Sequence, residues 1–267
     1  MPSPIAFPAG RTCAALLVAG ALNFVIPQLS GQTAASSAAP QRVPVLVELF
    51  TSEGCSDCPP ADALLAKLDA TQPISGAQAI VLSEHVTYWN HQGWSDPFSL
   101  DAMTERQEDY VRRFGLDSSY TPQMVVDGTD QFVGSNTRAL VAAIEKEAKT
   151  PTQSVAIMGA QWDHGAAQFS VHASAPSGAK LMAVLAADAT HEEVSAGENA
   201  GRTLHHTAVV RVMKEFGADA ADGRELKLPG GPLTQKTEAA GPVRLVVFLV
   251  DRKTGHVLGA AEQTLQR

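Results

Sequence analysis

Two nearly unbroken apolar runs and one helical repeat alternate along the first part of the chain. Residues 43–50 (V-P-V-L-V-E-L-F) and 79–82 (A-I-V-L) have the composition of strands that are buried on both faces. Between them Leu64, Leu65 and Leu68 recur at the spacing of a helix. The order strand, helix, strand predicts a βαβ unit whose two strands run parallel.

The pattern continues with further elements of both kinds. An aromatic segment without period comes first, and after it apolar residues recur on one helical face. Further along the chain, two short apolar runs flank an Asp-Gly turn signal. The expected elements are an ordered loop over 85–97, a helix over 101–114 ended by Gly115, a hairpin that joins 124–126 to 131–133 through Asp127-Gly128, and a helix beginning at Asn136 or Thr137.

The pattern changes after Thr150-Pro151 to short apolar segments separated by turns rich in Gly, Pro and Asp. Such spacing is typical of an antiparallel sandwich or barrel. The expected strands cover 154–158, 168–173, 180–187, 207–213, 224–228, 243–250 and 257–265. We therefore predict an α/β domain over 40–150, with a loop and helix insertion at 85–116, followed by a β-sandwich-like domain over 151–267.

The first 39 residues have the features of a secretory signal peptide. Arg11 is their one charged side chain, an apolar stretch runs from Cys13 to Leu29, and small residues follow it. Gly, Asn and Pro interrupt the stretch, which falls short of the ~20 apolar residues that a membrane anchor needs. The sequence predicts cleavage and a periplasmic or secreted mature chain without membrane attachment.

Composition excludes several classes of function. Of the 267 residues 45% are hydrophobic, which is ample for a packed core, and the formal net charge is −8 without any basic run. A nucleic-acid partner is therefore not expected. The sequence has no nucleophile elbow, phosphate loop, dinucleotide fingerprint or zinc-protease motif, so hydrolases, kinases and nicotinamide enzymes have no support.

The residues Cys55-Ser56-Asp57-Cys58 stand where the first strand passes into the first helix. Cleavage of the signal removes Cys13 and leaves this pair alone in an oxidising compartment, where a disulfide persists. At a helix N-terminus the macrodipole favours a thiolate. We expect Cys55 to be the exposed attacking thiol and Cys58 to be the more buried, resolving thiol.

Two neighbouring features refine this expectation. Thr121-Pro122 directly precedes the strand at Met124, and a cis bond there would present the Thr121 backbone to a substrate beside the cysteines. Glu53 and Asp57 flank Cys55 without any nearby Lys or Arg. Because nearby anions disfavour a thiolate, we expect a reductant, an isomerase-type partner or a stable disulfide instead of a strong oxidant.

Other interpretations of the same residues remain open. The pair could bind Cu(I) with His85 as third ligand, with His91 or Met124 as weaker candidates, although no cofactor is required for exchange. It could also be a structural disulfide in a binding module. Three aromatic side chains form either a substrate groove or a packing cluster. They are Tyr88, Trp89 and Trp94. His205 and His206 cannot both ligate one metal, because strand neighbours point to opposite faces, and we interpret them as surface residues.

Residues 47–62 (V-E-L-F-T-S-E-G-C-S-D-C-P-P-A-D) resemble the signature of the domain-of-unknown-function 1223 family. Matching segments are H-V-T-Y-W (85–89), G-W-S-D-P-F (93–98), T-E-R-Q (104–107), Y-T-P-Q-M-V-V-D-G (120–128) and G-E-N-A-G-R-T-L (197–204). The resemblance implies a secreted bacterial protein with a thioredoxin-like fold, but no reaction or substrate. The expected fold class is thus a thioredoxin-like domain followed by a β-rich domain, and the expected function is thiol–disulfide exchange with exported proteins or a redox partner.

Overall fold

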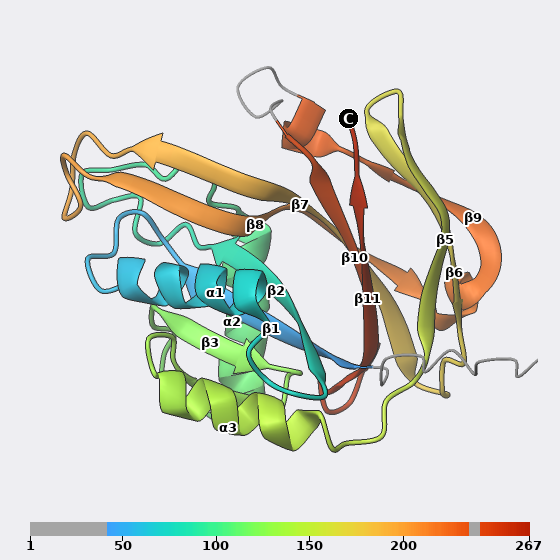
Figure 1. The fold of residues 1–267 in the computed structure, drawn as a ribbon. Coiled ribbons are helices and arrows are strands. Elements are labelled where there is room, and N and C mark those ends of the chain that lie inside the picture. The colour runs from blue at the N-terminus through green and yellow to red at the C-terminus, as the bar shows by residue number, and fades with distance from the viewer. Residues whose placement is uncertain (1–41, 235–240) are drawn as a thin grey trace, which may run out of the picture. The chain divides into compact units, whose positions relative to one another are not determined.

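The computed structural model describes residues 42–234 and 241–267, so the predicted signal peptide, with Arg11 and Cys13, lies outside them. Helices and strands follow one another along the described chain as shown in Figure 1. The helices are α1 (Pro59–Thr71), α2 (Asp101–Phe114) and α3 (Thr137–Glu147), with the short 3₁₀ helices η1 (Ala218–Ala221) and η2 (Gly231–Thr234). The strands are β1 (Val43–Thr51), β2 (Ala77–His85), β3 (Gln123–Val126), β4 (Asp130–Val133), β5 (Val155–Asp163), β6 (Ala166–Ala173), β7 (Ala179–Glu193), β8 (Thr203–Gly217), β9 (Asp222–Pro229), β10 (Val243–Asp251) and β11 (Val257–Leu265).

The predicted parallel pair is confirmed. Strands β1 and β2 run side by side in register from Val43 opposite Ala77 to Thr51 opposite His85, and α1 forms the crossover between them. Most side chains of both strands are buried, as their unbroken apolar sequences require. The carboxyl ends of the two strands therefore meet at the same edge of the sheet, where the cysteine pair follows β1.

The predicted hairpin is also confirmed. Strand β3 pairs antiparallel with β1 on one side and with β4 on the other. Asp127 and Gly128 both have positive φ, 45° and 67°, which is the conformation that a two-residue hairpin turn needs. A Cβ atom at position 128 would lie 2.2 Å from the Gly255 carbonyl oxygen, so the turn also needs glycine for close packing.

The expected fold class is wrong. Val209 of β8 pairs in parallel with Ser83 of β2, and this contact joins strands from both parts of the chain into one mixed sheet. Its order is β11-β10-β7-β8-β2-β1-β3-β4. The described residues are thus a β-rich assembly on one eight-stranded sheet, instead of a thioredoxin-like domain and a separate β domain.

Two properties of the strands explain why the two parts of the chain share one sheet: the free edge of β2, and the length of β7 and β8. Beside β1, strand β2 has a second edge whose backbone N–H and C=O groups need partners, and β8 pairs with this edge at Ser83 and Val209. Strands β7 and β8 each have 15 residues, about twice the length that their apolar patterns predict. Figure 1 shows that the β7–β8 hairpin extends well beyond β10 and β11, toward the part of the molecule that contains α1.

A second sheet covers one face of the large one. Strands β5, β6 and β9 form a three-stranded antiparallel sheet, at the right of Figure 1. Phe169 and Leu226 of this sheet share a buried apolar cluster with Leu185 and Leu245 of the large sheet. Two-layer packing therefore exists here, as expected for a sandwich, although its larger layer continues into the first part of the chain.

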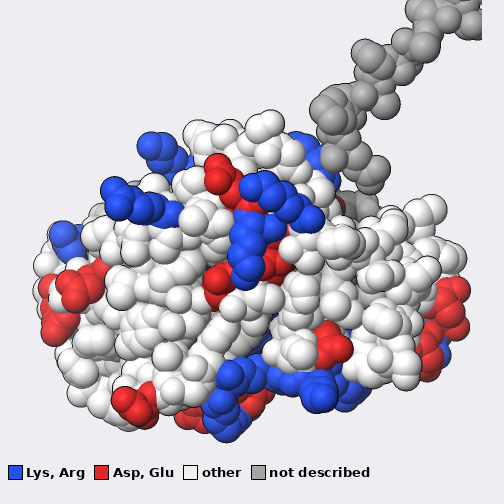
Figure 2. Space-filling view, turned by 90° about the horizontal axis from the view of Figure 1, so that it is seen from below, with Lys and Arg blue, Asp and Glu red and all other residues white. Residues whose placement is uncertain are grey.

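The outer surface carries mixed charge. On the face seen in Figure 2, acidic and basic side chains lie beside one another over a mostly neutral surface, without a large area of a single sign. Within residues 42–234 and 241–267, no helix is both long and apolar enough to cross a lipid bilayer.

Candidate functional site

Cys55 and Cys58 form a disulfide in the turn between β1 and α1 (residues 52–58, called the cysteine turn below), with their Cα atoms 5.4 Å apart. Cys58 is the N-cap residue of α1, and Pro59 and Pro60 occupy the first helical turn, where the missing N–H groups leave no hydrogen bond unmade. The local sequence thus fixes the disulfide at the helix N-terminus, as expected.

The expected exposure of Cys55 is wrong. Cys55 is 1% exposed and Cys58 is fully buried, whereas Ser56 and Asp57 between them are exposed. Two segments distant in sequence cover the pair: the aromatic loop (residues 85–97) and the tip of the β7–β8 hairpin (residues 194–202, called the hairpin tip below). The cover is a tertiary effect that no local pattern around the cysteines could indicate.

The hairpin tip is hydrogen-bonded to the cysteine turn. The buried side-chain amide of Asn199 donates to the carbonyl oxygens of Glu53, at 2.8 Å, and of Cys55, at 2.9 Å. A carboxylate oxygen of Glu198 accepts from the backbone N–H of Ser56 at 3.0 Å. Arg202 donates to the side-chain oxygen of Asn199 at 2.7 Å, which orients the amide. The G-E-N-A-G-R segment is therefore the part of β7–β8 that binds the cysteine turn.

The aromatic loop is also hydrogen-bonded to residues at and beside the turn. The indole N–H of Trp89 donates to the Thr121 hydroxyl at 2.7 Å, and that of Trp94 donates to the Glu53 carboxylate at 2.9 Å. Tyr88 is half-buried, and burial raises the pKa of its hydroxyl to about 12. All three predicted groove residues thus lie in the loop with their polar ends bonded to protein; their role in binding a substrate stays a prediction.

The Thr121–Pro122 peptide bond is cis, as predicted. Gln123, the next residue, pairs with Phe50 near the end of β1. Because the two strands are antiparallel, the cis bond lies beside the point where β1 leads into the cysteine turn. Thr121 is half-buried and Pro122 is buried.

Five ionisable side chains are buried beside the cysteine turn, and we call them the acid–histidine cluster. Nδ1 of His85 lies 2.7 Å from Oδ2 of Asp96, and Nε2 of His206 lies 3.1 Å from Oε1 of Glu53. The two imidazole rings meet edge to face with centroids 4.6 Å apart. Oδ2 of Asp62, on α1, lies 3.9 Å from Nδ1 of His206. The cluster therefore connects the cysteine turn, β2, α1, β8 and the aromatic loop.

Burial and neighbouring charges shift the pKa values in this cluster. Burial alone would raise the pKa of Asp96, but His85 and the backbone N–H groups of Glu53 and Phe98 lower it to about 2. Burial would lower the pKa of His85, but Asp96 raises it, so the two side chains form an ion pair. For Asp62 burial has the larger effect and raises the pKa of the carboxyl.

Several polar atoms of the cluster have no hydrogen-bond partner among the described residues. They are Oδ1 of Asp62, Nε2 of His85 and Nδ1 of His206. Buried polar groups are nearly always satisfied, so these three atoms mark hydrogen-bonding capacity that the described side chains of the cluster do not use. Within the described part of the chain, no group of three His, Cys, Asp or Glu side chains is arranged to hold a metal ion.

Sequence reasoning placed some of these residues and missed others. His85 lies beside the turn as expected, while His91 is exposed and Met124 is buried in the sheet core. The interpretation of His206 as a surface residue is wrong, since it is 4% exposed; its neighbour His205 is exposed. Alternation along β8 was the available signal, because it requires one of two adjacent histidines to face inward.

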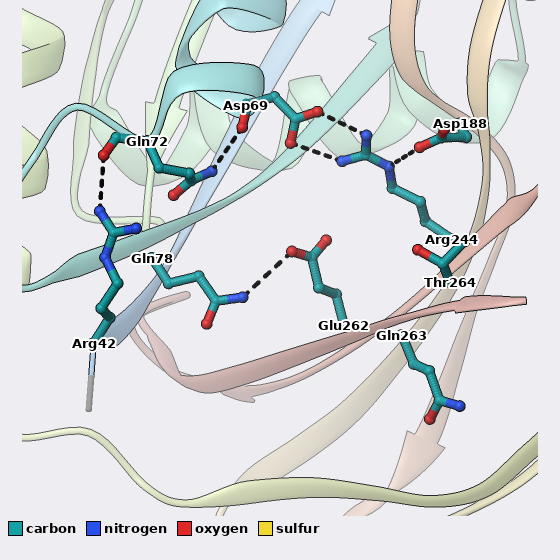
Figure 3. A pocket seen from close by; sticks show the side chains of 9 residues that line it. All are labelled: Arg42, Asp69, Gln72, Gln78, Asp188, Arg244, Glu262, Gln263 and Thr264. Carbon is teal, nitrogen blue, oxygen red and sulfur yellow. Dashed lines mark hydrogen bonds and ion pairs between the residues drawn. The ribbon is translucent and has the colours of Figure 1, made fainter. Parts of the chain in front are cut away.

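A separate polar cavity of about 520 Å³ lies between the end of α1 and the strands β2, β7, β10 and β11. In it Arg244 forms a two-pronged ion pair with Asp69 and a third bond to Asp188, and Gln78 donates to Glu262 (Figure 3). No residue of the cysteine turn or of the acid–histidine cluster lines this cavity. Its ion pairs tie α1 to the second part of the chain.

The chain belongs to the DUF1223 family, described as proteins of unknown function, whose sequence model matches residues 46–249. A search of curated proteins finds no match. The chain is similar to a protein from Agrobacterium tumefaciens of known crystal structure, with 25% identity over 84% of this chain and 95% of that one, at a TM-score of 0.62. Two β-glucuronidase structures from Bacteroides uniformis, at TM-scores of 0.15 over 12% of their length, carry no argument.

Proposed function

We propose that this protein carries out thiol–disulfide exchange through Cys55 and Cys58. The observation that carries the proposal is the position of the disulfide, at the first turn of α1 and at the end of β1 where β3 pairs with it. A disulfide that closes a four-residue loop stabilises a fold only weakly, because loop-closure entropy grows with loop length. A purely structural disulfide at this position would therefore stabilise the fold little, whereas disulfide exchange uses the helix N-terminus to stabilise a thiolate.

In the reducing direction, the Cys55 thiolate attacks one sulfur of a substrate disulfide. A mixed disulfide forms and the substrate's other sulfur leaves as a thiolate, which takes up a proton. The Cys58 thiolate then attacks Cys55, releases the second substrate thiol and restores the Cys55–Cys58 disulfide. Two electrons pass from the pair to the substrate, and a dithiol partner protein must return them.

Asp62 is suited to handle the proton of Cys58 in this sequence of steps. It lies four residues after Cys58, its backbone N–H donates to the Cys58 carbonyl at 3.1 Å, and both side chains are buried. Residues at this spacing lie on one face of a helix. Because burial raises the pKa of Asp62, its carboxyl can accept and return a proton nearer neutral pH than an exposed aspartate can.

The proposed substrates are exported proteins, or a redox partner, in the periplasm or outside the cell. The features of residues 1–39 and the use of cysteine support this location. The edge of the Thr121 backbone and the aromatic loop would hold an extended chain beside the cysteines. Binding of Cu(I) by Cys55, Cys58 and His85 stays a prediction that no specific contact favours.

The reduction potential of the pair tests the proposal. The protein is equilibrated in glutathione or dithiothreitol buffers, and free thiols in the Cys55–Cys58 peptide are counted by alkylation and mass spectrometry, with Cys55→Ser as the control. We expect a value between about −120 and −270 mV, the range of exchange proteins. A value below about −300 mV would indicate a structural disulfide and overturn the proposal.

A further inference from the structure

We propose that the hairpin tip holds the cysteine turn in its disulfide form, and that Glu198 is the positioning residue that sets this preference. The inference deepens the proposed function, but it requires only that the Cys55–Cys58 disulfide can be reduced and reoxidised. It gives a role to the G-E-N-A-G-R segment, whose Glu198 and Asn199 lie 142 and 146 positions in sequence from the turn residues that they bind.

The contact of Glu198 is made at the point where a thiolate would be stabilised. Within the turn, the N–H of Cys55 donates to the Ser52 carbonyl and the N–H of Cys58 donates to the Cys55 carbonyl. The N–H of Ser56, directly after Cys55, donates to the Glu198 carboxylate instead. Free N–H groups at a helix N-terminus stabilise a thiolate, so Glu198 occupies a donor that reduced Cys55 could use.

Charge makes this contact depend on the redox state. The disulfide is neutral, whereas a thiolate on Cys55 would be a second negative charge one residue from the Ser56 N–H. The Glu198 carboxylate is ionised, and its hydrogen bonds to Ser56 lower its pKa. The Glu198 carboxylate and a thiolate on Cys55 would repel each other, so the hydrogen bond between Glu198 and Ser56 is stronger in the oxidised protein. Thermodynamic reciprocity then requires the contact to make the disulfide harder to reduce.

The neighbouring Asn199 holds the hairpin tip on the cysteine turn through a neutral side chain, so its contacts do not depend on the charge of the cysteines. Its amide is buried and bonds to two carbonyl oxygens of the turn, and Arg202 orients it from the other side. Gly197 adds a close contact: its φ is +75°, and a Cβ atom there would lie 3.1 Å from the Cβ of Trp94. The neutral anchor thus keeps Glu198 over the turn, and the charge of Glu198 adjusts the redox equilibrium.

Glu198→Gln tests the inference, because glutamine keeps an acceptor oxygen for the Ser56 N–H and removes the charge. The matched control is Glu193→Gln, an exposed change of the same kind on the same hairpin. We measure the equilibrium between the full-length protein and glutathione at pH 7 and low salt. Glu198→Gln should raise the equilibrium constant for reduction about threefold, and the increase should shrink in 1 M salt because the charge is exposed. Glu193→Gln should leave the constant unchanged.

An unchanged constant in Glu198→Gln, or an equal shift in both variants, would overturn the inference. Failure of the inference and failure of the proposed function are distinguishable. A shift in Glu198→Gln alone, with no mixed disulfide ever formed through Cys55, would support the role of Glu198 and contradict exchange. Mixed disulfides without any shift would do the reverse.

Discussion

The Nε2 atom of His206 lies 3.1 Å from the Oε1 atom of Glu53, although 153 positions separate the two residues. Glu53 is two residues before Cys55, and His206 lies on β8 near the base of the hairpin tip. Both side chains are buried. The surroundings of the cysteine pair are therefore built from both parts of the chain, and the second part is structurally required at the site.

His206→Ala should destabilise the oxidised protein by about 2 kcal/mol, because it leaves the buried Oε1 atom of Glu53 without its hydrogen-bond partner, while Oε2 keeps its bond from Trp94. Urea unfolding followed by circular dichroism measures the effect. His205→Ala is the matched control: this neighbour is exposed, and its loss should change the free energy of unfolding by less than about 0.5 kcal/mol. Equal effects of the two changes would contradict the described pairing.

The His85–Asp96 ion pair should give stability a particular dependence on pH. The pKa of His85 is raised, so its contribution is complete below about pH 6.5, the unfolded value, and is lost as pH rises through the folded value. The pKa of Asp96 is lowered to about 2, so its contribution is present above about pH 3.9 and is lost in stronger acid. The pair therefore stabilises most between these limits.

Asp96→Asn should remove this contribution. The difference in free energy of unfolding between the protein and the variant should be about 2 kcal/mol near pH 5 and should fall above pH 7. Denaturant unfolding across this pH range provides the measurement. A difference that stays constant or grows from pH 5 to 8 would show that the two side chains do not form a folded-state ion pair.

Two buried carboxyl side chains, Glu48 and Glu84, lie on the side of the sheet that faces α2. Glu48 accepts from Arg106 and from the Tyr110 hydroxyl, both at 2.6 Å, while neither oxygen of Glu84 has a hydrogen-bond partner among the described residues. Burial, reinforced by the charge of Glu48, raises the pKa of Glu84 well above its usual range. The folded protein therefore keeps a proton on Glu84 that the unfolded chain releases, and stability falls as pH rises above about 4.5.

Glu84→Gln should remove this cost. We expect the variant to match the protein in stability at pH 4 and to exceed it by at least about 1 kcal/mol at pH 8. Glu48→Gln should instead lower stability by about 2 kcal/mol at pH 8, because Arg106 and Tyr110 each donate to one oxygen of Glu48 and glutamine keeps only one acceptor oxygen. Thermal unfolding at the two pH values distinguishes the variants, and a loss of stability in Glu84→Gln at pH 8 would contradict the assignment.

Local patterns predicted the elements well and their assembly poorly. The helix over 101–114 with its Gly115 cap, the Asp127-Gly128 turn and the capping of α3 by Asn136 are confirmed, because each depends on residues within a few positions of one another. The pairing of β8 with β2 was not predictable in this way. It depends on which strand edges meet, and no periodicity within either strand records that choice.

The candidate site likewise contains residues that local sequence predicts and residues that only tertiary contacts bring in. The Cys-Ser-Asp-Cys segment and the cis Thr121–Pro122 bond are readable from sequence, because a motif and a proline mark them. The inward position of His206 and the cover of Asn199 over Cys55 arise only when the long β7–β8 hairpin folds back onto the turn. The sequence signal for Asn199 was a motif that matched the family without an evident chemical use, and the signal for His206 was the alternation along β8.

The most direct test of exchange is to trap its intermediate. Cys58→Ala leaves Cys55 able to attack a substrate disulfide but removes the thiol that resolves the mixed species. Expressed in an exporting host and alkylated on lysis, this variant should carry exported proteins joined to Cys55 by bonds that dithiothreitol releases and that the double variant Cys55→Ala, Cys58→Ala lacks. If Cys55 is found only as a free, alkylated thiol, or if both variants yield the same species, the protein does not exchange disulfides through this pair.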